Sequence, residues 1–448
     1  MMRSIIRSWT PTKMIAVGYL VIILTGALLL TLPVASKGEG GMPFIDALFA
    51  ATTSTCVTGL VLQDLYTTWT LFGQIVILLL IQIGGIGFMT IAVTALMIAG
   101  RKIGLSSRLT MQEAVGAPQV GGIVKFTKFL LLGTLTVEGI GAVLLSFVYC
   151  PRLGFFKGVY FGIFHSVSAF CNAGLDLNGA FAPGSSLMEF KADPIINITI
   201  MALIVIGGLG FFVWRDVVQN KWHFKKYRLH TKIVLVTTAF LILSGAGLIL
   251  LFEYNGKAMA GLTGPEKVMA AFFQSITPRT AGFDTLGMAN LTQASQLLIM
   301  GLMLIGGSPG STAGGIKTTS FAVLVLTIVS EIKKRKYIEV FKHRAEDDVL
   351  KQVCTLLVAF LLLIFSATLA ICAIDGLPVK DVMFEVFSAI GTVGLTLGIT
   401  PHLTTIPRLI IIMLMFIGRV GCITLLLAFG GRRASKPSQW PVEKITIG

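Results

Sequence analysis

The chain has 448 residues, of which 54% are hydrophobic and only 13% are charged. This composition excludes an ordinary soluble globular domain and is typical of an integral membrane protein. The net charge of +15 does not indicate nucleic acid, because Lys and Arg gather in segments expected on one side of the membrane, without interleaved aromatic residues. The six Cys and five His residues show no metal-ligand spacing and no nucleophile–base pattern, so the sequence predicts neither a metal centre nor an enzyme.

Eight apolar runs have the length of a membrane-spanning helix. In chain order they cover about 14–33, 70–100, 126–149, 195–218, 231–254, 294–333, 350–374 and 405–430. The first run could belong to a cleaved signal peptide, but its nineteen apolar residues (14–32) are more than such a peptide usually has, and we expect an uncleaved helix. The charge distribution places both termini in the cytoplasm and predicts a multi-pass protein of the cytoplasmic membrane.

A shorter segment between the two runs of each successive pair is repeated. Four copies align without gaps: "FAATTSTCVTGL", "FHSVSAFCNAGL", "FFQSITPRTAGF" and "FEVFSAIGTVGL". Each copy has Phe ten residues before a glycine, and these glycines are Gly59, Gly174, Gly282 and Gly394. A segment of this length at membrane depth is expected to be a re-entrant helix followed by an extended loop.

A second motif recurs in the apolar run that follows each loop. It reads "IGGIG" at 83–87, "IGGLG" at 206–210, "IGGSPG" at 305–310 and "IGRVG" at 417–421. Two motifs that keep their order through four units predict one membrane domain built of repeats, about 14–100, 126–220, 231–335 and 350–430, followed by a C-terminal tail, 431–448. The expected fold is all-α, with eight transmembrane helices and four re-entrant pore helices around a pseudo-fourfold central pore.

The repeated loops are candidates for an ion-selectivity filter. Irregular backbone at membrane depth is tolerated where it is buried in protein or lines a water-filled path. Four such loops around one axis can turn backbone carbonyl oxygens inward and replace the hydration shell of a cation. The candidate potassium-binding residues are Val57, Thr58, Gly59, Asn172, Ala173, Gly174, Thr280, Ala281, Gly282, Thr392, Val393 and Gly394. The alternative for these glycines is close helix packing, which we expect for part of the second motif.

The long run 294–333 is interrupted by "GGSPGSTAGG", which cannot form a stable helix. A broken helix at membrane depth marks a functional site in transporters. We therefore predict a gate made of Gly306, Gly307, Ser308, Pro309, Gly310, Ser311, Thr312, Ala313, Gly314, Gly315, Lys317 and Arg419.

Arg419 is a gate candidate because it takes the place held by Gly85, Gly208 and Gly307 in the other motifs. It should therefore face the pore axis, where its five N–H donors could latch the loop shut and repel cations. The alternative is a structural ion pair, with Glu138 as a possible partner.

Other charged residues leave alternatives open. Lys317 either contributes to the gate or extends to the cytoplasmic surface. Arg279 is expected to point behind the third loop and brace it, and the intramembrane Glu138 needs a partner among Arg419, Lys317, Arg279 or backbone donors. Some carboxylates either concentrate cations at the pore mouth or belong to an ordinary surface: Asp46, Asp64, Asp176, Asp284 and Glu385.

The segments "FIDALFAATTSTCVTGL", "TPRTAGF", "FEVFSAIGTVGLTLG" and "FIGRVG" resemble the Trk/Ktr/HKT superfamily of cation transporters. The resemblance covers essentially the whole chain and is strongest to the Ktr membrane subunit, because the chain starts at the first helix pair without the two additional helices of Trk. It implies potassium uptake, with sodium as a stimulator or coupled ion and no cofactor in this chain.

The resemblance also implies partners. These are a second membrane subunit in a homodimer, a cytoplasmic ring of nucleotide-binding regulatory subunits, and the lipid bilayer. The ring would dock on the basic segments 221–232 and 331–348, and the tail 436–448 would contribute to the dimer contact. Two other functions remain open: a sodium or sodium-coupled cation carrier, and a carrier of an organic solute. Gly59 counts against the first, because relatives in the superfamily that have serine at this filter position prefer sodium.

Overall fold

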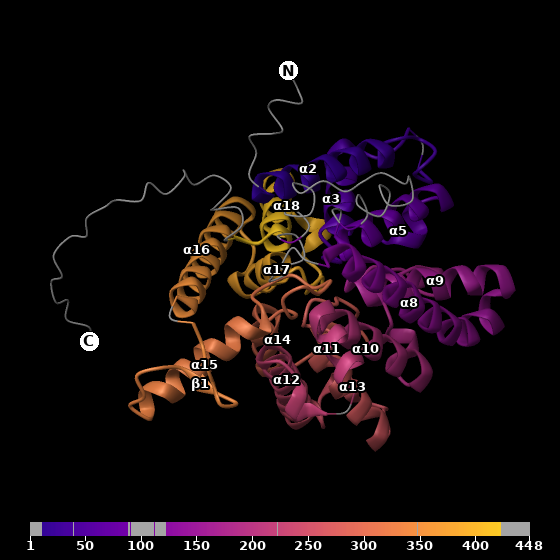
Figure 1. Cartoon of the computed structure of the whole chain (residues 1–448). Helices are drawn as coiled ribbons and strands as arrows, with labels where there is room; N and C mark the ends of the chain where they lie inside the picture. Colours follow the sequence, from indigo (N-terminus) through magenta and orange to yellow (C-terminus); the bar gives the residue numbers. More distant parts are fainter. Residues whose placement is uncertain are drawn as a thin grey trace.

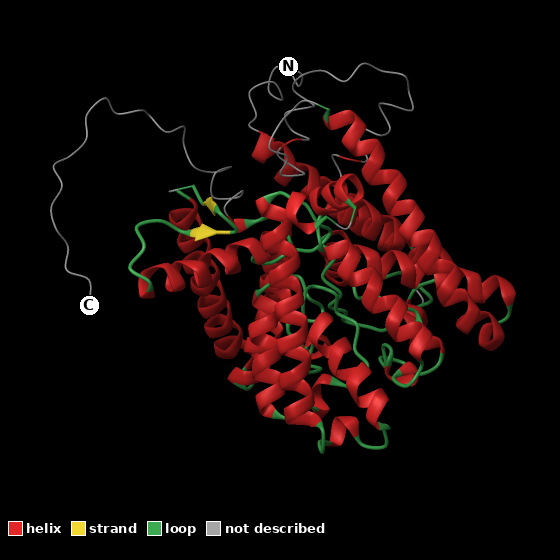
Figure 2. Cartoon of the chain, turned by 60° about the horizontal axis from the view of Figure 1, so that its bottom comes forward, coloured by secondary structure: helices red, strands yellow, loops and turns green. Residues whose placement is uncertain are grey.

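The computed structural model describes residues 11–38, 40–87, 90, 112, 122–221, 223–346 and 348–422. Within these residues the chain is mostly helical, and its only strands are the two-residue β1 (Glu339–Val340) and β2 (His343–Arg344), which form an antiparallel hairpin (Figure 2). Short helical turns complete the connections: α4 (Leu65–Thr68), η1 (Asn178–Ala180), η2 (Met188–Phe190), η3 (Phe224–Lys226), η4 (Lys257–Met259), η5 (Met288–Asn290) and η6 (Thr400–His402). The helical class expected from the sequence is confirmed.

Four long outer helices begin the four units. They are α2 (Pro11–Leu30), α8 (Ile123–Leu153), α12 (Leu229–Glu253) and α16 (Val349–Asp375). In the described part of the chain, these four are the unbroken helices that are long and apolar enough to cross a membrane. Large apolar side chains remain exposed on them, for example Leu132, Leu251 and Phe365, as expected for surfaces that face lipid.

Each outer helix packs against a shorter helix that follows it in the chain. These are the predicted re-entrant helices α3 (Phe44–Thr55), α9 (Phe155–Cys171), α13 (Gly264–Ile276) and α17 (Val379–Gly391). With 12 to 17 residues each, they are too short to cross a bilayer. Three of the four repeat phenylalanines, Phe49, Phe164 and Phe384, are fully buried, and Phe272 is partly buried, so the recurring aromatic residue serves packing.

The inner helices are short because each ends within its glycine motif or, for the third, directly before it. They are α5 (Leu71–Ile86), α10 (Pro194–Gly208), α14 (Gln293–Leu304) and α18 (Thr405–Val420). The motifs' last glycines, Gly87, Gly210 and Gly421, have φ values of 88°, 92° and 95°, so the right-handed helix cannot continue through them.

The second and third inner runs differ in how they continue. After α10 the chain bends by 96° into α11 (Phe211–Asn220), so the run 195–218 is not the continuous helix that we expected. The run 294–333 is divided into α14 and α15 (Thr318–Ile332) around the loop 306–315. With this bent pair counted as one span, the described residues contain five candidate spans, and the full number of eight stays a prediction.

The four units close into a ring. The inner helix of each unit packs against the re-entrant helix of the next: α5 on α9, α10 on α13, α14 on α17, and α18 back on α3. Figure 1 shows the same order as four sectors, indigo, magenta, pink to orange, and orange to yellow, around a centre occupied by loops. The contact between the last unit and the first brings segments separated by more than 350 residues together.

Candidate functional site

The four repeat glycines meet at the centre of the ring. Gly59, Gly174, Gly282 and Gly394 all have positive φ, at 95°, 63°, 82° and 97°. A Cβ on Gly174 would lie 2.8 Å from the Cα of Gly282, one on Gly282 would lie 3.3 Å from that of Gly394, and one on Gly394 would lie 2.8 Å from that of Gly59. A Cβ on Gly59 would lie 3.3 Å from the Cα of Gly174, which closes the circle. We call these four residues the glycine ring.

The residue two places before each ring glycine also has a left-handed backbone. These residues are Val57, Asn172, Thr280 and Thr392, with φ between 52° and 70°. Left-handed φ is uncommon for such side chains and costs free energy, especially for the β-branched ones. Its occurrence at the same position in four loops shows that the fold imposes one backbone path on all of them. The sequence carried little signal for this, because only Asn172 is of a residue type that readily adopts that conformation.

A hydroxyl from the end of each re-entrant helix braces the loop that follows. Thr53 Oγ1 accepts a hydrogen bond from the Gly59 amide, and Ser388 Oγ accepts one from the Gly394 amide, both at 3.0 Å. In the other two units the hydroxyl donates instead, from Ser168 to the Leu175 carbonyl and from Thr277 to the Phe283 carbonyl, both at 2.6 Å. These four braces are functional candidates that the sequence reasoning missed.

A cavity of about 260 Å³ opens above the glycine ring, on the side expected to face the cell exterior. All four ring glycines line it, together with three carboxylates, Asp64, Asp176 and Asp284. Burial, opposed by the Asn178 amide and reinforced by Asp64, raises the pKa of the Asp176 carboxyl to about 6. Because they line this cavity, the three carboxylates are placed to attract cations to the ring.

The other two predicted mouth carboxylates do not line this cavity. Asp46 forms an ion pair with Arg408 at 2.8 Å, which links α3 to α18. Glu385 is buried and accepts hydrogen bonds from Thr396, at 2.8 Å, and from Thr400. For both residues the structure supports a structural role rather than a place at the mouth.

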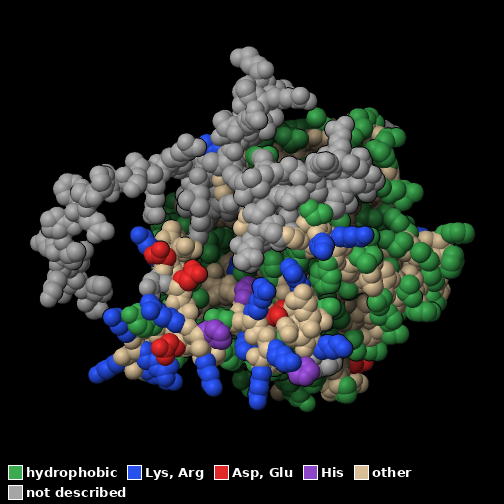
Figure 3. Space-filling view, in the orientation of Figure 1, with side chains coloured by type: hydrophobic (Ala, Val, Ile, Leu, Met, Phe, Trp, Pro, Cys, Tyr) green, Lys and Arg blue, Asp and Glu red, His purple; other side chains and the backbone are tan. Residues whose placement is uncertain are grey.

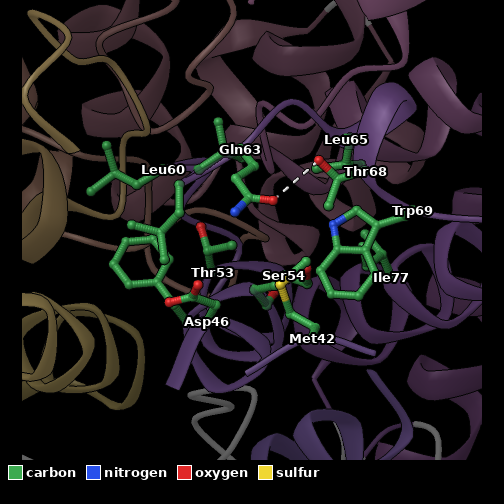
Figure 4. A pocket seen from close by; sticks show the side chains of 14 residues that line it. Met42, Asp46, Thr53, Ser54, Leu60, Gln63, Leu65, Thr68, Trp69 and Ile77 are labelled. Carbon is green, nitrogen blue, oxygen red and sulfur yellow. Dashed lines mark hydrogen bonds between the residues drawn. The ribbon is translucent and has the colours of Figure 1, made fainter. Parts of the chain in front are cut away.

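A second, much smaller pocket lies behind the first loop (Figure 4). Thr53 and Gln63 point into it from opposite sides, and the Thr68 hydroxyl donates to Gln63 Oε1 at 3.4 Å. Its volume of about 20 Å³ leaves room for roughly one water molecule. This pocket therefore belongs to the packing of the loop and does not qualify as a ligand site.

The loop 306–315 lies directly beneath the glycine ring, against the second unit. The amide of Ser308 donates to the Gly208 carbonyl at 2.9 Å, and the Thr312 hydroxyl donates to the Phe170 carbonyl at 3.1 Å. A Cβ on Gly314 would collide with the Thr392 hydroxyl, so the loop also touches the fourth loop from below. The segment predicted as a gate thus spans the centre of the molecule.

Arg419 reaches this loop from the fourth unit. Its guanidinium donates to the carbonyl of Thr312 and, on the first unit, to the carbonyls of Gly84 and Gly85, the latter at 3.1 Å. One side chain therefore connects the loop of the third unit to the end of α5. No ion pair with Glu138 occurs among the described residues, which leaves the latch geometry as the better supported of the two alternatives.

The comparisons with known proteins identify the family. The TrkH family model, described as a cation transport protein, matches residues 6–436. The chain belongs to the TrkH family of cation transport proteins. It is 40% identical to the potassium/sodium uptake protein NtpJ of Enterococcus hirae over 100% of this chain and 99% of that protein. It is 39% identical to the Ktr system potassium uptake protein B of Bacillus subtilis over 94% and 93% of the two chains.

A solved structure supports the fold of this TrkH-family chain. The potassium transporter TrkH from Vibrio parahaemolyticus matches it with a TM-score of 0.70 at 21% identity, over 93% of this chain and 85% of the other. The resemblance to the Trk/Ktr/HKT superfamily seen in the sequence is confirmed, and the chain is a membrane transporter of cations. The family assignment gives no support to a carrier of organic solutes.

The three remaining intramembrane charges of this family member have partners. Lys317 folds back onto the loop and donates to the Ala313 carbonyl at 2.7 Å, so it does not extend to the cytoplasmic surface. Arg279 is 7% exposed and donates to the Thr238 hydroxyl at 3.5 Å, so it points behind the third loop as expected. Glu138 accepts a hydrogen bond from Gln82 at 3.0 Å, a partner that sequence reasoning had not considered.

The first glycine of the second motif serves packing, as expected for part of it. A Cβ on Gly84, Gly207 or Gly418 would collide with a carbonyl at the end of the re-entrant helix of the same unit. Because glycine has no side chain, the inner helix can approach that backbone closely. The motif therefore sets how near the inner helices come to the loops, while its last glycine ends the helix.

Proposed function

We propose that the protein takes up potassium across the cytoplasmic membrane through a pore whose selectivity filter is formed by the four repeated loops. The observation that carries this proposal is the closed glycine ring, in which each loop touches the next. Loops from four units of one chain then surround a single axis, and that axis opens into a cavity lined by carboxylates.

The filter would work through backbone oxygens. The loop amides bond back to their re-entrant helices, for example Thr58 to Thr53 and Val393 to Ser388, both at 2.8 Å. Backbone oxygens of the loops are then left to coordinate a cation in place of water. This explains how the side chains can differ among the loops while the backbone path is retained.

The loop 306–315 with Arg419 is proposed as the gate, and the described conformation as its closed state. The loop blocks the axis below the ring, and hydrogen bonds join it to the second unit and, through Arg419, to the first. A positive guanidinium at this depth also raises the electrostatic barrier to cations. Opening then requires the hydrogen bonds of Thr312 with Phe170 and Arg419 to break, so that the loop can move away from the axis. A regulatory subunit could drive this movement.

The cytoplasmic face supports the proposed regulatory partner. The two predicted basic segments, 221–232 and 331–348, meet at Phe224 and Phe341, whose rings are 6.2 Å apart. Figure 3 shows the Lys and Arg side chains of this face gathered over α15 and β1 and beside them. An acidic surface on a ring of nucleotide-binding subunits would fit this patch.

The remaining assembly proposals rest on the family alone. The resemblance to the family implies a homodimer in which each subunit has its own pore. The C-terminal tail, 431–448, which we expect to contribute to the dimer contact, lies outside the described residues. Both termini are proposed to be cytoplasmic. Nucleotide is expected on the regulatory subunit and not on this chain.

A sodium or sodium-coupled carrier is the second candidate, favoured by the name of the 40% identical potassium/sodium uptake protein. The decisive experiment is the flux of potassium and of sodium into liposomes that contain the purified protein, with Gly59→Ser beside the wild type. Serine at this position would bring its Cβ within 2.6 Å of the Ala173 carbonyl, so it must displace one of the carbonyls at the ring.

The filter proposal predicts a potassium preference in the wild type that Gly59→Ser reduces. The control is Gly261→Ser, because Gly261 also has positive φ, at 78°, but no atom within 4 Å of an added Cβ. A wild type that prefers sodium would instead support the second candidate. If Gly59→Ser keeps the potassium preference of the wild type, the proposal that the loops form the filter is wrong.

A further inference from the structure

Arg279 is a buried guanidinium with few hydrogen-bond partners. It is 7% exposed, and in the described part of the chain it makes one hydrogen bond, from Nη2 to the Thr238 hydroxyl at 3.5 Å. Its Nε is buried without an acceptor, and none of the ion pairs among the described residues includes it. Because a guanidinium has five N–H donors and an unpaired buried charge is strongly destabilising, Arg279 requires a further polar partner.

A small cavity lies against this guanidinium. Its volume is about 10 Å³, close to the roughly 10–15 Å³ that one water molecule requires. Arg279 forms its wall together with the neighbouring Ile276, with Thr238 on α12, and with residues of the second unit and of the gate loop. The cavity therefore has the size for one water molecule, and a strong donor faces it.

The far wall of the cavity is the contact that holds the gate loop. This wall includes Gly208, at the end of α10, and Gly307, in the gate loop. The Gly208 carbonyl accepts the hydrogen bond from the Ser308 amide at 2.9 Å, and a Cβ on Gly307 would lie 3.1 Å from that same carbonyl oxygen. A water molecule in the cavity would thus lie between Arg279 and the attachment of the gate loop to the second unit.

The repeat shows that this position in the loop faces the preceding unit. Cys171 holds the place of Arg279 in the second loop, three residues before the ring glycine. A Cβ on Gly85 would lie 2.5 Å from Cys171 Sγ, and Gly85 holds the place of Gly208 in the second motif. The same contact between units is therefore made by a thiol in one case and reached by a guanidinium in the other.

We propose that a buried water molecule binds in this cavity and links Arg279 to the gate loop. The guanidinium donates a hydrogen bond to the water oxygen, and the water donates to backbone carbonyl oxygens of the cavity wall, each of which has a second lone pair. Arg279 is then a positioning residue for the gate as well as a brace of the third loop. This inference rests on the proposed function and deepens it.

The first test is a crystal structure of the full-length protein, grown with bromide in place of chloride, at a resolution that shows ordered water. The proposal predicts a water peak within hydrogen-bond distance of Arg279 Nε or Nη1, without anomalous signal from bromide. In Arg279→Met, which replaces the guanidinium with an apolar side chain of similar length, the peak should disappear. An apolar replacement of a buried charge is often tolerated, so we expect this variant to fold.

Potassium flux into liposomes without a regulatory subunit supplies the second readout. Arg279→Met should raise it about fivefold, the effect of one lost hydrogen bond of ordinary strength, and should leave the potassium-to-sodium ratio unchanged. Arg279→Lys keeps a charged donor and should stay near the wild-type flux. The control is Ser275→Ala: the buried Ser275 hydroxyl also joins α13 to α12, through the Ile242 carbonyl at 2.9 Å, but it lies outside the cavity.

The outcomes separate this inference from the proposed function. A wild-type structure with no water peak beside Arg279, or with a bromide peak there, would overturn the water link and leave the filter and the gate intact. Wild-type flux in Arg279→Met, an equal rise in Ser275→Ala, or a changed ion ratio without a rise in flux would overturn the role of Arg279 at the gate. No potassium flux in the wild type or in Arg419→Ala would instead overturn the proposed function, and the gate role of Arg279 with it.

Discussion

The glycine ring and the gate loop lie one above the other, yet they are stabilised in different ways. The ring is made of four loops that follow the same backbone path, and each is braced by a hydroxyl from its own re-entrant helix. The loop 306–315 occurs once, and besides hydrogen bonds within its own unit it contacts the ends of helices in other units. A repeated, self-braced element suits a fixed function such as selectivity. A single element held by its neighbours can be released when one contact is lost.

The largest effect is expected from disrupting the ring itself. Gly174→Ala would place a Cβ 2.8 Å from the Cα of Gly282, a distance that backbone cannot tolerate without moving. Potassium flux should fall about a hundredfold or more in liposomes. Gly376→Ala is the matched control, because Gly376 has φ 65° against 63° for Gly174 but no neighbour within 4 Å. Equal loss in both variants would mean that backbone strain alone, and not the ring, explains the effect.

The next largest effect should come from releasing the gate loop. Arg419→Ala removes the hydrogen bonds that join Thr312 to the end of α5. Hydrogen bonds from a charged donor contribute about 1.5–3 kcal/mol each, so flux without a regulatory partner should rise about tenfold or more. Arg419→Lys, which keeps the charge but not the two-sided contact, should give an intermediate flux. Unchanged or reduced flux in folded Arg419→Ala protein would rule out a latch.

A brace should have a smaller effect than the ring that it supports. Ser388→Ala leaves the Gly394 amide without its 3.0 Å partner, a loss of about 1 kcal/mol. The potassium-to-sodium flux ratio should fall severalfold while total flux persists. Ser366→Ala on α16 is the control, because that hydroxyl bonds only within its own helix. If both variants keep the wild-type ratio, the hydroxyl brace does not maintain selectivity.

The smallest effect concerns the cavity above the ring. The Asp176 carboxyl has a pKa raised to about 6, so it is charged at pH 7.5 and becomes protonated as the external pH falls through 6. Loss of this negative charge should lower uptake about twofold at low potassium concentration. Asp176→Asn should show the lower uptake at pH 7.5 and little further change on acidification. A pH profile that is the same in wild type and variant would exclude Asp176 as the titrating group.

The sequence predicted the repeated loops and the broken third run, which its pattern shows directly, and missed features that depend on backbone geometry or on which side chains meet. Gly59 and its three equivalents stood out because the motif recurs at one register. The bend at Gly210, between α10 and α11, was missed because the apolar run continues through it, and only the backbone dihedral reveals it. Gln82 was not recognised as the partner of Glu138 because an amide in an apolar helix gives no sign of what it faces.

The central claim is that four loops of one chain form a single filter around one axis. The most direct test is the potassium-to-sodium flux ratio in liposomes, measured for glycine-to-serine variants at Gly59, Gly174, Gly282 and Gly394 in turn. The account predicts that each of the four variants lowers the ratio, because each loop contributes to the same ring. A ratio that stays at the wild-type value in any one variant with measurable flux would contradict the account, since that loop would then lie outside the filter.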